Sequence, residues 1–413
     1  MKIGVFHPGT QHSWQTAIAL QQLGKLAWYA TSIFYQPDRF PYRLEKMVPA
    51  PLAARLNAEF RRFENSQLDP GLVRTSGLAE WLERIAARAG YHELARKIDT
   101  FGNRRFVNTL AADIRSAEPF ALWGYNGSSH STFALAKQFG RTCILDRTNG
   151  DSRAYNAMMA NIRDRYGSWF LPTEMAVPAG EISRDDLEYE MADTILVGSP
   201  FAAQTIRDAV PNPAIHAKLR VLEYGFDEVL FASMPRPVSV DRNAPVKFLF
   251  LGLAIPRKGI HLVLEAISRI PSSMAELTLV GDLKIPQHVF AGYADRVEYR
   301  TSVARADVPK IMQEHHVLVL PSYFEGAGIV LYEALAAGCA LIQSNRCTPA
   351  VTSETGLMLD SLDSDTLHAA MMSVIEDRDR LDWWRSNAQA SAQRFTFARY
   401  RDNIADLLQD LGL

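Results

Sequence analysis

Short apolar runs alternate with amphipathic stretches along most of the chain, and this alternation predicts strands followed by helices. The first apolar run, at residues 3–6, predicts a buried strand, and Pro8 and Gly9 predict a turn after it. Helical spacing over residues 15–23 and a further apolar run over 25–33 complete a predicted βαβ unit. The pattern returns between FALWGYNGSS, which begins at residue 120, and KLRVLEYGFD, which ends at residue 227.

A second series of strands and helices begins at Val246. Its strands are predicted in KFLFLGL, ELTLVGD, VEYRTSV, HHVLVLPSYF and CALIQS, and its helices in IHLVLEAISRI and VLYEALAAG. The segment GFDEVLFASMPRPVSVDRNAP separates the two series, and its prolines and polar residues are typical of a linker. We therefore predict an α/β protein of two Rossmann-like, doubly wound domains that face a central cleft, where ligands of such sheets bind.

The predicted boundaries follow from these two series. The N-terminal domain spans residues 1–232, the linker 233–245 and the C-terminal domain 246–395, and residues 396–413 form a helix that we expect to cross back to the N-terminal domain. Residues 42–114 are helical in pattern and rich in arginine, as in FRRFEN and EWLERIAARAG. The usual interpretation of such a segment is a solvated helical face, and the alternative is a surface for a membrane or a lipid-linked substrate.

Composition narrows the class of protein. The 413 residues are 47% hydrophobic and 22% charged, which is typical of a folded protein with more than one core. A formal net charge of −2 gives no strong field for nucleic acid. The N-terminus lacks the pattern of a signal peptide, no apolar stretch approaches the roughly 18 residues of a spanning helix, and the three cysteines form no CxxC pair. We expect a cytoplasmic protein, at most peripheral at the inner face of a membrane.

The stretch PSYFEGAGIVLYEALAAG, residues 321–338, carries the first candidate site. It predicts a strand end, a glycine-rich turn and a helix that begins near Gly328, and a helix N-terminus preceded by small residues favours an anion. Glu325 and Glu333 stand on either side of this helix start, where they are suited to accept hydrogen bonds from hydroxyl pairs. A ligand that carries hydroxyl groups on either side of a diphosphate matches a nucleotide sugar. The alternative is that both are ordinary polar residues of a core helix. No His or Asp accompanies them at ligand spacing, so a metal site is the weaker interpretation.

The stretch FLGLAIPRKGIHLVLEA carries the second candidate site. A strand ends at Gly252, and Arg257 and Lys258 follow as adjacent cations that could neutralise a diphosphate leaving group. The alternative is a solvated pair of loop cations. LTLVGD adds Gly281 and Asp282 in another loop at the same edge of the predicted sheet.

Together these motifs resemble the E-x7-E signature of retaining glycosyltransferases of family four, which have the GT-B fold. The resemblance covers the second domain and the last third of the first, including VGSPFAAQTI and RFTFARYRDNI. It implies that Glu325 binds hydroxyls of the donor sugar, that Glu333 binds the nucleotide ribose and that Lys258 binds phosphate. The remaining implied binding positions are Gly9, Thr10, Gly252, Gly281, Gly326, Gly328, Ile329 and Val330, and the implied catalytic residues are Lys258, Arg257 and Glu325.

Three positions depart from the family pattern. Leu253 stands where the family usually has an arginine, and Arg257 is the candidate replacement for its charge. The turn at Gly9 and Thr10 has one glycine of the usual pair. Asn149 stands where the family often has a histidine, so no side-chain base is implied there.

The resemblance implies a retaining glycosyltransferase that moves a sugar from a UDP- or GDP-type donor to a saccharide or lipid-linked acceptor, without a metal cofactor. Front-face attack, in which the leaving phosphate takes the acceptor proton, and surface polysaccharide synthesis are implied in the same way. We expect the acceptor near residues 124–130 and near Asp146, Arg147 and Asp151, with residues 42–114 shaping that side. The alternatives are a nucleotide-sugar-binding GT-B protein without transferase activity, and a GT-B phosphorylase or epimerase.

Overall fold

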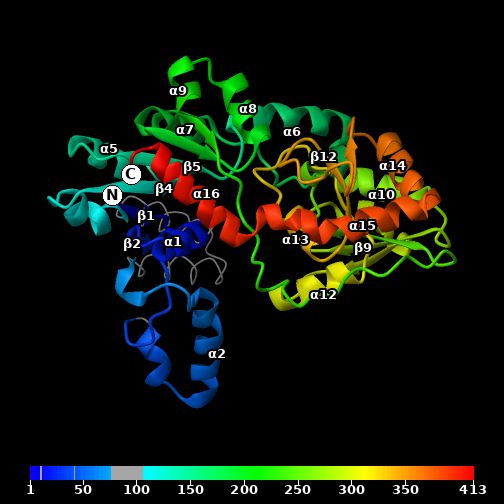
Figure 1. The fold of residues 1–413 in the computed structure, drawn as a ribbon, viewed down its shortest axis with the longest axis horizontal. Helices are drawn as coiled ribbons and strands as arrows, with labels where there is room; N and C mark the ends of the chain where they lie inside the picture. The colour runs from blue at the N-terminus through cyan, green and yellow to red at the C-terminus, as the bar shows by residue number, and fades with distance from the viewer. Residues whose placement is uncertain (10–11, 41, 76–105) are drawn as a thin grey trace.

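Two parallel β-sheets, each covered by helices on both faces, make up the computed structural model, which describes residues 1–9, 12–40, 42–75 and 106–413 (Figure 1). The first sheet has seven strands in the order β3-β2-β1-β4-β5-β6-β7, and the second has six in the order β10-β9-β8-β11-β12-β13. Neighbouring strands run parallel, as in the pair β1 and β4 and the pair β8 and β9. The predicted fold class, two doubly wound α/β domains, is confirmed.

The first sheet and its helices alternate along the N-terminal half of the chain. Residues 106–114 are also helical. The elements are β1 Lys2–Phe6, α1 Ser13–Gln22, β2 Leu26–Thr31, the 3-10 helix η1 Tyr42–Lys46, α2 Ala50–Phe60, β3 Val73–Thr75, β4 Phe120–Tyr125, α5 His130–Gln138, β5 Cys143–Arg147, α6 Ser152–Tyr166, α7 Ala179–Met191, β6 Thr194–Val197, α8 Pro200–Ala209, α9 Pro213–Lys218 and β7 Leu219–Val221.

The strands of the second sheet also alternate with helices along the chain, and the last helix returns to the first sheet. The elements are β8 Val246–Leu251, the 3-10 helix η5 Pro256–Lys258, α10 Ile260–Ser268, β9 Ala275–Val280, α11 Gln287–Ala291, β10 Val297–Arg300, α12 Val308–Gln313, β11 Val317–Leu320, α13 Ile329–Ala336, β12 Ala340–Ser344, β13 Gly356–Leu359, α14 Ser364–Glu376, α15 Arg378–Ala392 and α16 Phe397–Asp410.

Each sheet has one point at which the strand order reverses. In the first sheet this point lies between β1 and β4, and in the second it lies between β8 and β11. Ligands of doubly wound sheets bind beyond the carboxyl ends of the strands at such a point, because the loops there diverge to opposite faces. The fold therefore places the loops that follow β8 and β11 side by side, and these loops contain the two sequence motifs.

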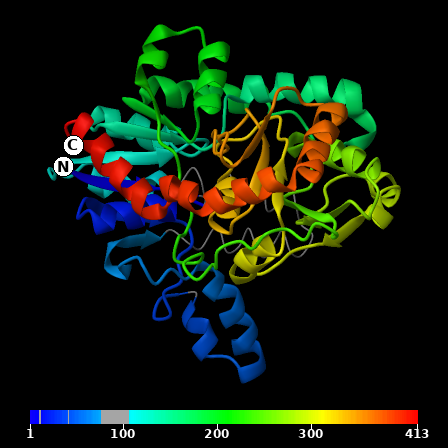
Figure 2. The same cartoon turned by 45° about the vertical axis from the view of Figure 1, so that its right-hand side comes forward.

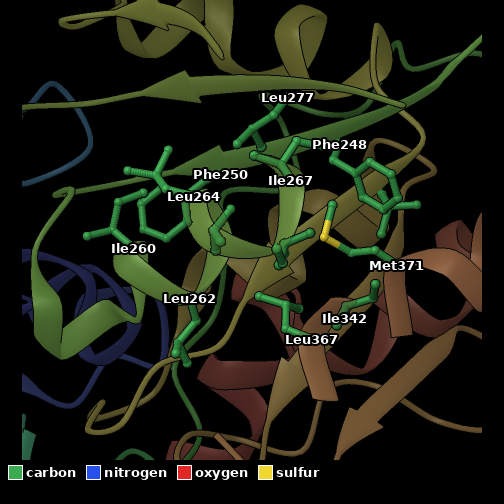
Figure 3. Close-up of a cluster of buried hydrophobic side chains, with 14 of the residues drawn as sticks. Phe248, Phe250, Ile260, Leu262, Leu264, Ile267, Leu277, Ile342, Leu367 and Met371 are labelled. Carbon is green, nitrogen blue, oxygen red and sulfur yellow. The ribbon is translucent and has the colours of Figure 1, made fainter. Parts of the chain in front are cut away.

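The core of the second domain explains why its strands are apolar at nearly every position. Figure 3 shows Phe248 and Phe250 of β8 packed against Ile260, Leu264 and Ile267 of α10, together with Leu367 and Met371 of α14. All of these side chains are fully buried. Helices cover both faces of a parallel sheet, so alternate positions of a strand such as VKFLFL both face a core.

Each domain contributes one helix to the other half of the molecule. Met159 and Ile162 of α6 belong to the core of the C-terminal domain, and the ring centroid of Tyr166 lies 4.4 Å from that of His261 in α10. In return, α16 crosses to the first sheet, where Tyr400, Ile404 and Leu408 join the core around Ile3 and Val5 (Figures 1 and 2). The two domains are thus packed against each other through two reciprocal helices. The boundary at residues 233–245 stays a prediction.

A buried hydrogen-bond network ties α16 to the first sheet. The Thr16 hydroxyl lies 2.6 Å from the Tyr125 hydroxyl and 2.8 Å from the Tyr400 hydroxyl. Beside it, the Asp146 carboxylate accepts hydrogen bonds from Tyr224 at 2.5 Å and from Trp123 at 3.2 Å. Burial raises the pKa of Asp146 to about 6, although these donors oppose the shift. Asp146 was expected near an acceptor; its side chain is enclosed within the domain and committed to this network.

The helical prediction for residues 42–114 holds only in part. Tyr42–Lys46, Ala50–Phe60 and residues 106–114 are helical, but Val73–Thr75 is the edge strand β3, paired with β2. A three-residue strand is too short to leave an alternating pattern, which explains the error. Residues 76–105 lie outside the described residues. Within the described ranges, no helix has both the length and the hydropathy of a membrane-spanning segment.

Replacing Tyr400 with phenylalanine is expected to lower the free energy of unfolding by about 1 kcal/mol, because the buried bond to Thr16 is lost without a change in packing. Urea unfolding of the full chain measures this loss. Tyr299→Phe is the matched control, since Tyr299 is a partly buried tyrosine outside the network. Equal stability of the two variants would contradict the role assigned to this bond.

Candidate functional site

The candidate site lies where the loops after β8, β9 and β11 meet. Gly252 and Gly281 have φ angles of 138° and 137°, and a Cβ atom on Gly281 would overlap the Gly252 carbonyl group. Gly259 has a φ angle of 71°, and a Cβ atom on it would overlap the Pro321 carbonyl group. These three positions require glycine because the loops approach each other closely in a backbone conformation that other residues rarely adopt. The close approach brings the loop with Lys258 onto the loop with Glu325.

The Glu325 carboxylate is held by two cations. Its Oε1 atom lies 3.1 Å from Lys258 Nζ and 3.2 Å from Arg257 Nη1, and the Ser322 hydroxyl donates to the same oxygen at 3.2 Å. Arg257 also donates to the Phe324 carbonyl. The Glu325 side chain is buried, so this set of partners is what makes an ionised carboxylate tolerable there. The hydrogen bond from Arg257 to Phe324 thus joins the two sequence motifs, although these residues lie 67 positions apart in the chain.

The electrostatics of the cluster keep Glu325 charged. Burial alone would raise the pKa of the Glu325 carboxyl group, but the charges of Lys258 and Arg257 outweigh burial and hold the pKa below its ordinary value. The carboxylate is therefore an acceptor of hydrogen bonds at neutral pH and has no proton to donate. A group in this state suits the binding of hydroxyls better than general acid catalysis.

The helix α13 begins beside this cluster. Gly328 is its N-cap residue, with a φ of 89°, and no side chain caps the helix. Among the described residues, the backbone N–H groups of Ile329 and Val330 donate to no recorded acceptor, whereas the Leu331 N–H donates to the Gly328 carbonyl at 2.9 Å. Free N–H groups at a helix N-terminus attract anions. The start of α13 therefore has free N–H groups where the sequence analysis expected them, and anion binding there stays a prediction.

Glu333 has a partner that the sequence analysis did not find. Its buried carboxylate forms an ion pair with Arg305, which lies just before α12 and is exposed. Arg305 stands in the loop after β10, at the same edge of the second sheet as Gly252 and Gly281. Nothing in the local sequence TSVARADVPK marks this arginine. The signal that could have found it is its place after a predicted strand of the same sheet.

The N-terminal domain closes one side of the site. A Cβ atom on Gly326 would overlap the Thr148 carbonyl oxygen, and the Thr348 hydroxyl donates to the Gly198 carbonyl at 3.0 Å. The Phe324 ring lies between Tyr155 and Phe201, with both centroid distances 5.4 Å. The loop with the Glu325 carboxylate is therefore fitted against the loop after β5, and the site lies between the domains.

Of the two predicted site residues after β1, the structure describes Gly9 but not Thr10. Gly9 lies three residues after the end of β1, and its carbonyl accepts a hydrogen bond from the Thr31 hydroxyl at 3.2 Å. Thr10 lies outside the described residues. No recorded contact joins Gly9 to Glu325 in the part of the chain that the structure describes, so the structure does not bring Gly9 together with the main cluster.

Several polar groups expected near an acceptor have structural partners. The buried Glu188 carboxylate accepts hydrogen bonds from the backbone N–H groups of Gly127, Ser129 and His130 at 2.8–3.1 Å, which caps α5. Burial raises the pKa of Glu188 to about 7, against the effect of these donors. Asp151 caps α6 by accepting from the Arg153 N–H at 2.8 Å. The amides of Gly127, Ser129 and His130 are thus committed to the fold.

The described residues contain no group of three or more His, Cys, Asp or Glu side chains arranged to hold a metal ion. His315 is buried and its Nδ1 atom lies 2.6 Å from the Ile311 carbonyl, and His316 Nδ1 accepts from the Lys247 N–H at 3.1 Å. Both histidines therefore have structural partners. Positive charge at the candidate site comes from Lys258, Arg257 and Arg305.

Replacing Gly326 with alanine is expected to lower the free energy of unfolding by about 1–3 kcal/mol, because the added methyl group overlaps the Thr148 backbone. Chemical unfolding measures the loss, and amide hydrogen exchange of residues 146–151 reports the loosened contact. Gly180→Ala is the matched control, since Gly180 lies in α7 and a Cβ atom there meets nothing within 4 Å. An unchanged stability and exchange rate in Gly326→Ala would show that the loops do not touch.

Comparisons with known proteins show which sequences and folds the chain resembles. The model of the family described as "Glycosyl transferases group 1" matches residues 245–377. Escherichia coli O-antigen chain mannosyltransferase B is 28% identical over 152 residues, which cover 34% of this chain and 39% of that protein. The chain thus matches about two fifths of the length of this curated relative.

Solved structures match over the whole chain. Sucrose-phosphate synthase from Thermosynechococcus elongatus superposes with a TM-score of 0.67 at 18% identity and covers 100% of this chain and 99% of that one. Anabaena HepE in complex with UDP superposes with a TM-score of 0.61 at 16% identity and covers 99% and 100%. The chain therefore has the GT-B fold of two Rossmann-like domains, and its C-terminal domain is similar to group 1 glycosyltransferases.

Proposed function

We propose that the protein is a retaining glycosyltransferase that moves a sugar from a nucleotide-diphosphate donor to a saccharide or lipid-linked acceptor. The observation that carries the proposal is the Glu325 carboxylate, held between Lys258 and Arg257 beside the uncapped N-terminus of α13. The similarity of residues 245–377 to group 1 glycosyltransferases supports it. A hydroxyl-binding carboxylate next to two cations and a helix N-terminus is complementary to a sugar diphosphate.

In the proposed complex the diphosphate lies between Lys258, Arg257 and the N–H groups of Gly328, Ile329 and Val330. Glu325 then accepts hydrogen bonds from donor-sugar hydroxyls, and Glu333 accepts them from the ribose. Gly252, Gly281 and Gly326 belong to the loops proposed to surround the donor. The missing side chains of Gly281 and Gly326 let these loops pack against the backbone of Gly252 and Thr148. Gly9 and Thr10 are proposed to approach the donor from the N-terminal domain.

The proposed reaction breaks the bond between the sugar C1 atom and the leaving phosphate oxygen. The acceptor oxygen bonds to C1 on the face that the phosphate leaves, and the acceptor proton passes to the phosphate, so no protein base is required. Negative charge grows on the leaving nucleoside diphosphate, and Lys258, Arg257 and the helix N-terminus stabilise it. Asn149, which carries no base, is consistent with this route.

Arg257 supplies the charge that Leu253 does not. Leu253 is 43% exposed and follows Gly252, where the family pattern has an arginine. Arg257 and Lys258 are consecutive residues of η5, and both approach the Glu325 Oε1 atom. We propose that this pair carries the role that a divalent metal plays in other transferases, so that transfer is metal-independent, with UDP or GDP as the leaving group.

The proposed setting is the synthesis of surface polysaccharide at the cytoplasmic face of a membrane. The O-antigen relative supports this setting through its printed name. The segment of η1 and α2 projects from the rest of the chain in both views (Figures 1 and 2). The exposed apolar side chains in and beside this segment are Phe40, Leu44, Met47 and Leu52, and the exposed cations that accompany them are Arg39, Arg43 and Lys46. This mixture suits the interface of an anionic bilayer.

Lys258→Ala and Glu325→Gln are each expected to lower the rate of transfer by about 100-fold or more, because a charge-stabilising group or a sugar-binding carboxylate is lost. Release of nucleoside diphosphate from a panel of UDP and GDP sugars, with and without EDTA, measures the rate. Glu354→Gln is the matched control, since Glu354 is exposed and outside the cluster. Wild-type rates in both site variants would refute the assignment, and donor binding without turnover in the wild type would favour the non-catalytic alternative.

Met47→Asp and Leu52→Asp are expected to reduce binding to vesicles of phosphatidylglycerol and phosphatidylcholine several-fold, because a carboxylate at the interface is repelled and poorly buried. Co-sedimentation of the full chain with these vesicles measures binding. Val238→Asp is the matched control, since Val238 is 78% exposed and lies outside the η1–α2 segment. A loss of binding in the Val238 variant equal to that of the other two would exclude the segment as the contact.

A further inference from the structure

A pocket of about 340 Å³ lies beside the Glu325 cluster on the side of the N-terminal domain. The N-terminal domain supplies most of its wall, and the C-terminal domain supplies Arg257 and Phe324. This volume is near the lower end of the roughly 300–1,000 Å³ of small-ligand sites, so it suits a single compact ring better than a chain. The wall residues from the N-terminal domain are Asn126, Arg147, Asn149, Gly150, Ser152, Tyr155, Met175 and Val177. We call this cavity the Tyr155 pocket.

The two cations of the Tyr155 pocket are already neutralised. Arg147 forms a buried ion pair with Asp185 at 2.8 Å and donates to the Gly150 carbonyl at 2.9 Å. Arg257 is paired with Glu325 at 3.2 Å, and in the proposed complex its remaining N–H groups face the donor diphosphate. A phosphate or carboxylate in this pocket would meet no unpaired cation, and anions are costly to bury without one.

Neutral polar groups are available in the same wall. The Asn126 side-chain oxygen accepts from the Thr148 N–H and hydroxyl at 3.1 and 3.2 Å, which leaves its amide nitrogen as a donor. The Asn149 amide and the Tyr155 hydroxyl have no recorded hydrogen-bond partner among the described residues. Two amides and a phenol can both donate and accept, which matches the hydroxyl groups of a sugar.

Apolar side chains complete the pocket. The rings of Tyr155 and Phe324 meet edge to face with centroids 5.4 Å apart, and Met175 and Val177 line the pocket from the segment after α6. Asn156 holds that segment in place, since its side chain pairs with both the N–H and the carbonyl of Val177 at 2.8 and 2.9 Å. A rigid aromatic wall can pack against the C–H face of a sugar ring while the amides form hydrogen bonds with the hydroxyl groups of that ring.

We propose that the Tyr155 pocket binds an uncharged sugar ring of the acceptor, and that it selects against uronic acids and sugar phosphates. This inference rests on the proposed glycosyl transfer and adds the chemical class of the acceptor. Assignment to the acceptor follows from the lining, because most of it belongs to the N-terminal domain and none of Gly281, Arg305 or Glu333 contributes to it. Arg257 and Phe324 connect the pocket to the loop in which the donor sugar is proposed to bind.

The test uses the purified full chain with saturating UDP or GDP and defined monosaccharide probes. The neutral probes are the methyl α-glycosides of glucose, galactose and mannose, and the charged probes are glucuronate and glucose 6-phosphate. Saturation-transfer NMR measures binding of each probe, and calorimetry measures nucleotide binding separately. At least one neutral glycoside is expected to bind about tenfold more tightly than both charged probes.

Four variants report on the wall. Asn149→Ala and Tyr155→Ala are expected to weaken binding of the neutral glycoside about tenfold, and Tyr155→Phe to weaken it less, because the aromatic wall remains. Asn161→Ala is the matched control on the exposed face of α6, outside the pocket. Nucleotide affinity is expected to stay unchanged in all four, and thermal unfolding checks that each variant is folded.

Two results would overturn the inference. The first is binding of glucuronate or glucose 6-phosphate as tight as that of every neutral glycoside. The second is a loss of nucleotide-sugar affinity in Asn149→Ala or Tyr155→Ala that equals the loss of glycoside affinity, since the pocket would then belong to the donor. Failure of the wild type to bind any nucleotide would instead refute the proposed function, while glycoside binding would still be read from the same spectra.

Discussion

A buried negative charge must find cations, and in this protein that requirement decides how the loops of the second sheet meet. The Glu325 carboxylate is enclosed, and only Lys258 and Arg257 among the described residues pair with its charge. Both cations come from the turn after β8, so that turn has to lie on the loop after β11. Gly259 and Gly328 adopt left-handed conformations at the two ends of this contact, where other residues would be strained. The glycines and the charges of the two motifs are therefore parts of one arrangement.

The same arrangement reaches the N-terminal domain through packing. Gly326 lies against the backbone of Thr148, and Phe324 is inserted between the rings of Tyr155 and Phe201. The helix α6 continues this contact into the core of the C-terminal domain. The loop that carries Glu325 is thus positioned by the backbone of the other domain, which is the kind of arrangement that the proposed transfer between two bound sugars needs.

The sequence predicts well those features that depend on local pattern. Strands such as VKFLFL are apolar at every position except Lys247 because both faces of a parallel sheet are covered, and the glycines before α13 are required by the helix start. Features that depend on partners far along the chain leave no such pattern. Arg305 pairs with Glu333, which lies 28 residues further along the chain. Glu188 caps α5 through residues that lie 58 to 61 positions before it. The three-residue strand β3 is defined only by its pairing with β2. Asp146 was expected near an acceptor, and only the aromatic donors around it in the structure show that it is buried.

The return of α16 to the first sheet has a consequence for synthesis on the ribosome. Residues 2–31 are synthesised before the second sheet, but the core that they form includes Tyr400, Ile404 and Leu408, which are synthesised after it. Until then Thr16 lacks one of its buried partners, and the apolar surface around Ile3 and Val5 stays open. Domains that are complete in sequence fold as they emerge. The core of the first domain in this protein cannot be completed until the second sheet has been synthesised.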